Sequence, residues 1–136
     1  NKKIPYSCIP TIVIAELAVA MLEGARKYGR HNYRIASVVS SVYTDAAKRH
    51  IDDYIEGEDI DEDSGLHHIV KAIASLVVLR DAMIQHKVID DRPPKSPKYW
   101  MELLNEKVEK IIKEHPNCKP VYVEGDQNGS LSCPFP

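Results

Sequence analysis

The chain has 136 residues, which is enough for one hydrophobic core but not for two. Its formal net charge of −2 provides no basic field for general nucleic-acid binding. No apolar run approaches the roughly 20 residues that cross a bilayer, so we expect no membrane segment. Three cysteines without a CxxC spacing indicate neither a disulfide scaffold nor a zinc site, and they favour a cytoplasmic protein.

The first half of the chain predicts two helices. Residues 1–10 hold two prolines and are predicted to be extended. Apolar residues at helical spacing then predict a first helix over 11–28, which Gly29 ends. A second helix is predicted over 36–56, and Gly57 is its natural stop.

The second half predicts two more helices. A third helix is expected over 66–84, with Asp63 or Ser64 as its cap. It is apolar nearly all round, which is typical of a central, buried helix. A fourth, amphipathic helix begins near Trp100 and ends near His115.

Four helices with short connections predict an all-α chain, a four-helix bundle-like domain with an irregular C-terminal arm. We place the domain over residues 1–115 and the arm over 116–136. The arm could hold one short hairpin, because Val121-Tyr122-Val123 precedes a group of turn residues. A β-rich fold would need alternating strands, and these are absent before residue 120.

Helical spacing also places polar side chains on common faces, one pair on each of the first three helices. The pairs are Glu23 and Lys27, His50 and Asp53, and His68 and Lys71. If these faces meet, they line a single pocket. The alternative is that the acids, and any histidine taken alone, lie on solvated helix faces and line no pocket. A solvated face explains Lys71 less well, because its helix is expected to be buried and burying a lysine without a partner is costly.

An acidic turn joins the second and third helices, and histidines bracket it. Its sequence, Asp59-Ile60-Asp61-Glu62-Asp63-Ser64-Gly65, invites comparison with an EF-hand calcium loop. We reject that comparison because the glycine falls one place late and Val70 replaces the bidentate glutamate. The turn could still offer oxygens to Mg²⁺ or Mn²⁺, or it could be a plain solvated loop.

A basic and aromatic segment, residues 26–34, follows the first helix. It holds four Lys or Arg, one His and two Tyr, the groups that clamp phosphates and stack on a base. The alternative is a charged, exposed turn. Together with the acidic turn, the segment indicates a ligand with phosphates, a metal ion and a flat ring, and a nucleotide fits this description.

Several short motifs follow one another within about residues 4–85. They are Ile9-Pro10, Gly24-Ala25-Arg26-Lys27-Tyr28-Gly29, Asn32-Tyr33, Ala46 with Arg49-His50, Gly57-Glu58 with Asp61, and Ser64-Gly65 with His68. In this order they resemble the dATP/dGTP diphosphohydrolase N-terminal family, MazG-like relatives of the all-α nucleoside triphosphate pyrophosphatases. Residues 86–136 carry no such resemblance.

The resemblance implies an oligomeric helical bundle that hydrolyses a (deoxy)nucleoside triphosphate to its monophosphate and pyrophosphate with Mg²⁺ or Mn²⁺. The catalytic residues that it implies are Glu58, Asp61, His50 and His68. The metal ligands would be Glu23, Asp53, Glu58 and Asp61. The nucleotide contacts would come from Lys27, Tyr28, His31, Asn32, Tyr33, Arg34, Arg49 and Lys71.

The chain departs from the wider superfamily, which carries an ExxE pair on one helix and an ExxD pair on the next. Here the second helix offers His50 and Asp53, and the third offers His68 and Lys71. The metal site is therefore either rebuilt from the acidic turn or lost together with catalysis.

Three functions remain open at this point. The first is a pyrophosphohydrolase in the cytoplasm of a bacterium or a phage-infected cell. The second is a non-catalytic protein of phage origin that sequesters a nucleotide or a nucleotide-derived signal. The third is a structural or interaction domain. For the first two we expect a homo-oligomer with a small-molecule ligand and no membrane partner.

Overall fold

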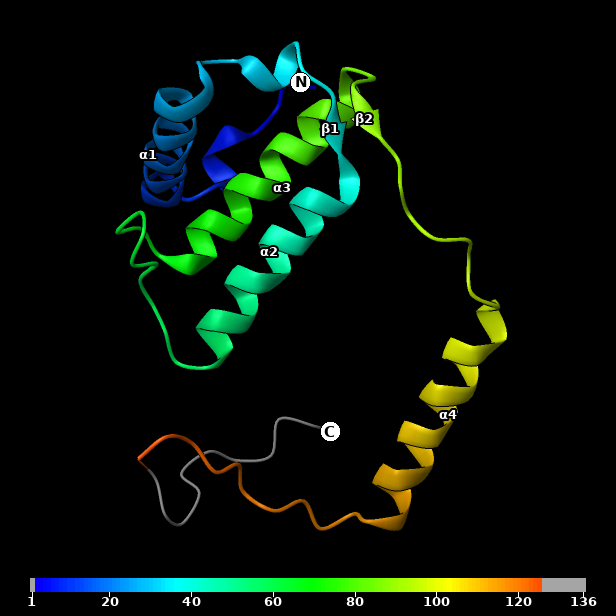
Figure 1. Ribbon diagram of the computed structural model, residues 1–136. Coiled ribbons are helices and arrows are strands. Elements are labelled where there is room, and N and C mark those ends of the chain that lie inside the picture. The colour runs from blue at the N-terminus through cyan, green and yellow to red at the C-terminus, as the bar shows by residue number, and fades with distance from the viewer. Residues whose placement is uncertain (1, 126–136) are drawn as a thin grey trace. The chain divides into compact units, whose positions relative to one another are not determined.

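The computed structural model describes residues 2–125 of the chain (Figure 1). The chain divides into two compact units, Asn1–Pro93 and Pro94–Pro136, which are described separately below. Four α-helices and only one two-stranded parallel sheet make up the regular structure of the described residues, which confirms the predicted all-α class. The predicted boundary after residue 115 falls inside the second unit and stays a prediction.

Helix α1 spans Thr11–Tyr28, the bounds that its apolar spacing predicts. It ends because Gly29 has a φ of +95°, a backbone conformation that glycine adopts without strain. The Gly29 N–H still donates to the carbonyl oxygen of Ala25 at 2.8 Å. Before α1, the segment predicted to be extended contains a short 3₁₀ turn, Tyr6–Cys8.

Helix α2 spans Ser40–Ile55 and helix α3 spans His68–Ile84. The predicted caps of α3, Asp63 and Ser64, are wrong, because both residues lie inside the preceding turn. The cap is His67, whose ring nitrogen Nδ1 accepts the N–H of the residue two positions later at 3.1 Å.

The start of α2 lies four residues later than predicted because the chain forms a strand there. Strand β1 (Val38–Val39) pairs in parallel with strand β2 (Val88–Ile89). Each strand has only two residues, so neither leaves an alternating pattern in the sequence. The lack of alternating strand patterns before residue 120 therefore excludes a β-rich fold but does not reveal this one small sheet.

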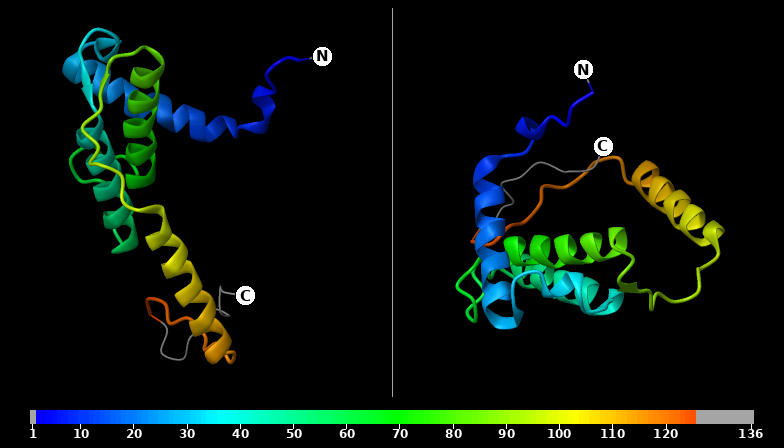
Figure 2. Two further views of the ribbon diagram at one scale, coloured as in Figure 1. Left: turned by 90° about the vertical axis from the view of Figure 1, so that its right-hand side faces the viewer. Right: turned by 90° about the horizontal axis from the view of Figure 1, so that it is seen from above.

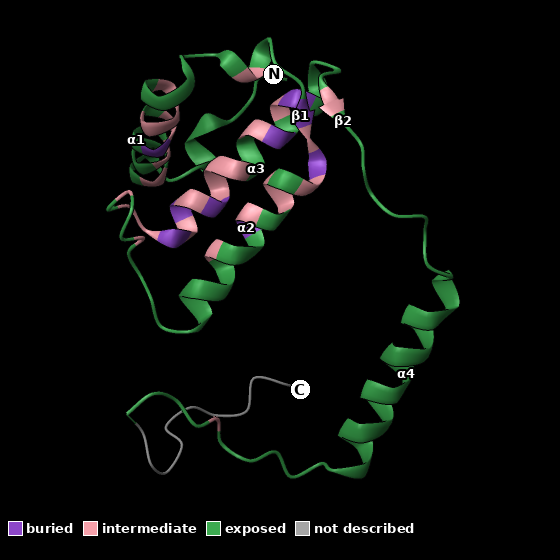
Figure 3. Ribbon diagram, in the orientation of Figure 1, coloured by how far each residue is buried: buried purple, intermediate pink, exposed green. Residues whose placement is uncertain are grey.

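Helix α3 is central to the first unit, as predicted, because it packs against both α1 and α2. The three helices are not all aligned: both views in Figure 2 show α1 crossing the α2–α3 pair at a steep angle. Val38, Leu79 and Ala82 form the buried core where β1 meets α3. Figure 3 shows the buried residues gathered along these facing surfaces.

In the second unit, helix α4 spans Lys98–Glu114, close to its predicted bounds. None of its residues is buried (Figure 3). The cysteine pattern did not predict that Cys118 forms a disulfide bond. The turn at Asn128-Gly129, on which the predicted hairpin depends, lies outside the described residues. Within residues 2–125, we find no helix with the length and apolar character that crossing a membrane requires.

Candidate functional site

The acidic turn between α2 and α3 is held together by its own backbone. The Asp61 N–H donates to the carbonyl oxygen of Leu66 at 2.8 Å, and the His68 N–H donates to that of Asp59 at 2.9 Å. Gly65 adopts a φ of +71°, which the tight return of the chain requires. The turn is therefore an ordered connection that fixes the positions of its acids.

Asp61 is the acid of this turn that is most firmly held. Its Oδ2 accepts a hydrogen bond from the Ser64 hydroxyl at 2.8 Å. Partial burial acts to raise the pKa of Asp61, but the Ser64 hydrogen bond and the nearby His50 and Lys71 outweigh it. The net effect lowers the pKa, so this carboxylate is ionised at neutral pH.

Two imidazoles meet where the last turns of α2 approach the first turn of α3. Nδ1 of His50 lies 2.8 Å from Nδ1 of His68. Burial, followed by the neighbouring His68, acts to lower the pKa of His50 and outweighs the opposing effect of Asp61. His68 is only 2% exposed, and its Nε2 lies 3.1 Å from Oε1 of Glu58. Oδ2 of Asp53 lies 4.0 Å from Nδ1 of His68.

An ion pair links α1 to α3. Lys71, one turn after His68, donates from Nζ to Oε1 of Glu23 at 2.5 Å. Lys27 approaches the same oxygen at 3.5 Å. The Lys71 hydrogen bond is the largest influence on Glu23 and lowers its pKa. Glu23 is therefore a carboxylate between two lysines, which explains how α3 accommodates the charge of Lys71.

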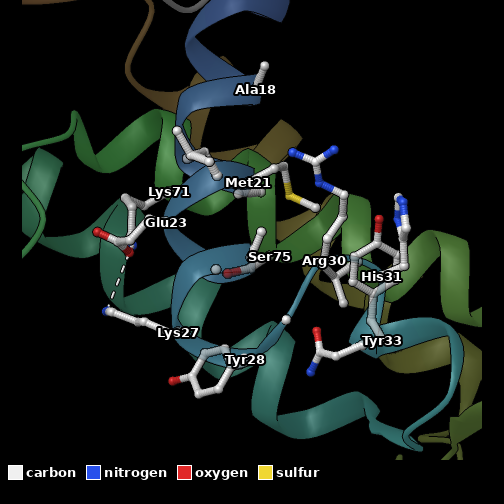
Figure 4. A pocket seen from close by; sticks show the side chains of 18 of the residues that line it. Ala18, Met21, Glu23, Lys27, Tyr28, Arg30, His31, Tyr33, Lys71 and Ser75 are labelled. Carbon is white, nitrogen blue, oxygen red and sulfur yellow. Dashed lines mark hydrogen bonds and ion pairs between the residues drawn. The ribbon is translucent and has the colours of Figure 1, made fainter.

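A cavity of about 550 Å³ opens beside this ion pair. Its wall is formed by the second half of α1, the segment 29–33, the middle of α3 and Tyr43 of α2 (Figure 4). Polar groups of Glu23, Lys27 and Lys71 lie at one side, and the ring of Tyr28 lies below them (Figure 4). A cavity of this size, with an apolar wall and a few charged groups, suits a small organic ligand with an anionic part.

The structure separates the predicted single pocket into two neighbouring parts. The predicted nucleotide contacts that line the cavity are Lys27, Tyr28, His31, Asn32, Tyr33 and Lys71. The predicted residues around the buried imidazole are His50, Asp53, Glu58 and His68. We call this second group the imidazole–carboxylate cluster. It does not line the cavity, but the α3 backbone connects the two parts, because His68 and Lys71 are one helical turn apart.

Two predicted phosphate ligands lie elsewhere. The Arg34 guanidinium forms a bidentate ion pair with the Asp81 carboxylate, with N···O distances of 2.7 and 2.8 Å, and is therefore not free to bind a phosphate. Arg49 is exposed and does not line the cavity. Conversely, the cavity includes Arg30 and Ser75, which we had not selected. Helical spacing does place Ser75 near the site, because it follows Lys71 by one turn on the same face of the helix.

The arrangement combines a ligand-sized cavity, a lysine pair and an adjacent group of carboxylates and imidazoles. A search of protein families matches residues 1–92 to the model described as dATP/dGTP diphosphohydrolase, N-terminal. The chain belongs to this family. The dATP/dGTP diphosphohydrolase N-terminal family was also the resemblance that the ordered motifs indicated, and the match confirms it.

A relative named dATP/dGTP diphosphohydrolase, from Salmonella phage PMBT28, is 31% identical over 90 residues. The aligned part is 66% of this chain and 30% of that relative, so the chain spans about a third of the relative's length. No solved structure matches the chain. Membership of the dATP/dGTP diphosphohydrolase N-terminal family thus rests on sequence, and the geometry of the site comes from this structure alone.

Proposed function

We propose that this chain acts as a nucleotide pyrophosphohydrolase, converting a (d)NTP to a (d)NMP and pyrophosphate. The observation that carries the proposal is the cavity with Lys27 and Lys71 at its edge, one helical turn from the imidazole–carboxylate cluster. The family and the name of the phage relative agree with this chemistry. The cavity would take the nucleoside, and the lysines would take the phosphates.

The aromatic and amide groups of the cavity would hold the base and sugar. Tyr28, Asn32 and Tyr33 line it and offer ring faces and hydrogen-bonding groups. Lys27 and Lys71 would neutralise the phosphates, exchanging their present contact with Glu23 for stronger contacts with a polyanion. The triphosphate would then extend along α3 toward its first turn.

Glu58 and Asp61 are the carboxylates that we assign to Mg²⁺. Their oxygens are the hard donors that this ion prefers; Asp61 lies in the ordered turn, and Glu58 directly precedes it. The ion would polarise the phosphoryl oxygens and lower the pKa of a bound water. Glu23, a further predicted ligand, holds two lysines in this structure and fits the role less well.

Hydrolysis needs a water molecule in line with the bond between the α- and β-phosphates. Its oxygen forms the new bond to phosphorus as that P–O bond breaks and pyrophosphate leaves. The proton that the water loses must go to a nearby base. Glu58 is suitable, through the carboxylate oxygen that does not bind the ion.

A non-catalytic function is the second candidate. The engagement of Glu23 by two lysines leaves few free carboxylates beside the cavity, which favours nucleotide sequestration. For either function we propose a homo-oligomer. The apolar side chains of Ile12, Val19 and Leu22 on α1 are exposed and offer a surface for a second copy.

The test is to incubate the chain with each of the common dNTPs and NTPs and Mg²⁺, and to measure pyrophosphate and nucleoside monophosphate. We expect both products in equal amounts, with at least one deoxynucleotide among the substrates. Tight binding of intact nucleotide without products would support nucleotide sequestration and contradict hydrolysis. If the chain neither releases these products nor binds a nucleotide, both functions are contradicted.

A further inference from the structure

The imidazole–carboxylate cluster has the composition of a metal site of its own. One ligand atom from each of His50, Asp53 and His68 lies within 4.8 Å of the other two. His50 and Asp53 are three residues apart on α2, so both point from the same helical face. His68 is the first residue of α3, which packs beside α2 (Figure 1). Three donors from two packed helices therefore converge on one point.

The buried ring of His68 lacks a well-aligned hydrogen bond at one of its two nitrogens. Only 2% of the His68 surface is exposed to solvent. Among the described residues, its Nε2 is the buried side-chain polar atom without a hydrogen-bond partner. Glu58 lies 3.1 Å from that atom, but out of line for a hydrogen bond. A buried polar atom left without a partner is costly and is rarely retained without a reason.

The other nitrogen of His68 faces His50 across 2.8 Å. Two ring nitrogens at this distance need either a shared proton or a shared cation, because their lone pairs repel each other. Nitrogens bound to one metal ion at about 2.1 Å lie roughly 3.0–3.4 Å apart, depending on the bond angle. A movement of about half an ångström or less would therefore convert the contact into a pair of metal–nitrogen bonds.

Glu58 completes the arrangement from the other side of the His68 ring. A histidine that binds a metal through one nitrogen usually donates its other N–H to a carboxylate, which fixes the ring. Here Nδ1 of His68 would face the ion, and Nε2 would face Glu58. Binding would turn the ring slightly and bring the Nε2–H into line with the carboxylate.

We propose that His50, Asp53 and His68 bind one divalent transition-metal ion, with Glu58 positioning His68. Two imidazoles and one carboxylate favour ions such as Zn²⁺ or Co²⁺ over Mg²⁺, which prefers oxygen donors. Three protein ligands leave at least one position for water or a phosphate oxygen. The proposal goes beyond the pyrophosphohydrolase function, because it concerns an ion other than the Mg²⁺ that we assign to Glu58 and Asp61, and because its three ligands are other residues.

Cobalt provides a direct readout, since Co²⁺ on nitrogen and oxygen ligands has visible absorption bands that report its coordination. The full chain, freed of metal with a chelator, is titrated with Co²⁺ and then with Zn²⁺ or excess Mg²⁺. We expect one Co²⁺ per chain, displacement by Zn²⁺ and no displacement by Mg²⁺. A spectrum equal to that of hydrated Co²⁺, or easy displacement by Mg²⁺, would overturn the proposal.

Variants locate the ion. Asp53 is exposed on α2, so Asp53→Asn should fold normally and weaken Co²⁺ binding at least tenfold. The matched control is Asp52→Asn, the same change at the exposed neighbouring residue, and it should bind as the unchanged chain does. Equal affinity of Asp53→Asn and Asp52→Asn would refute the assignment.

Histidine variants provide the second comparison. His50→Gln should remove the Co²⁺ spectrum, whereas His115→Gln, on an exposed histidine of the second unit, should leave it unchanged. An unchanged spectrum in His50→Gln would also refute the site. None of these readouts uses a nucleotide, so failure of metal binding and failure of pyrophosphate release are separate results.

Discussion

Replacing Glu58 with glutamine is expected to lower the rate of pyrophosphate release by about 100-fold or more. The substitution keeps the size of the side chain but removes the charge that we assign to the metal ion and to the attacking water. Glu58 is half exposed, so the change should not unfold the chain. Asp61→Asn should have a comparable effect, because it removes the second of the two carboxylates that we assign to Mg²⁺.

The control for this experiment is Glu62→Gln, in the same acidic turn. Glu62 is exposed, so loss of its charge should change the rate less than twofold. Rates are measured from pyrophosphate release at saturating dNTP, with circular dichroism to verify that each variant is folded. A Glu58→Gln variant as active as Glu62→Gln would exclude Glu58 from the catalytic machinery.

Leu79→Ala is expected to lower the free energy of unfolding by about 2–5 kcal/mol. Leu79 is only 5% exposed and packs with Val38 and Ala82, where β1 meets α3. Truncation there leaves a cavity in a small core, and few neighbouring side chains can move to fill it. The change should be measured by urea unfolding, followed by circular dichroism of the helices.

Leu76→Ala is the matched control, one turn earlier on the same helix. Leu76 is 46% exposed, so its truncation should cost clearly less than that of Leu79. Circular dichroism is preferable to fluorescence because the single tryptophan, Trp100, lies on α4 in the second unit. Equal losses for the two leucines would mean that the core does not lie at the β1–α3 contact.

The helices follow from the sequence because their signals are local. The apolar spacing of α1 and the glycine that ends it, Gly29, both lie within a few residues of the structure that they determine. The pairing of β1 with β2 is different, since its residues are 50 positions apart and each strand is too short for a pattern. The cap of α3 was misplaced because the acidic turn closes on itself and leaves His67 at the helix start.

The site could be predicted in part for the same reason. Helical spacing correctly grouped Glu23 with Lys27, and a lysine on the central helix required a partner, which Glu23 provides. The spacing could not show that His50 and His68 would lie beside the cavity and not in its wall. Nor could it show that Arg34 would pair with Asp81, because this contact joins segments that only the folded chain brings together.

The claim on which the account rests is that the cavity between α1 and α3 binds a nucleoside triphosphate with its phosphates on the lysines. Amide chemical-shift mapping tests it directly, with a dATP analogue in which a methylene group replaces the oxygen between the α- and β-phosphates. We predict saturable shifts concentrated in residues 27–33 and 71–75. Shifts confined to α4, or no shifts at millimolar analogue, would contradict it.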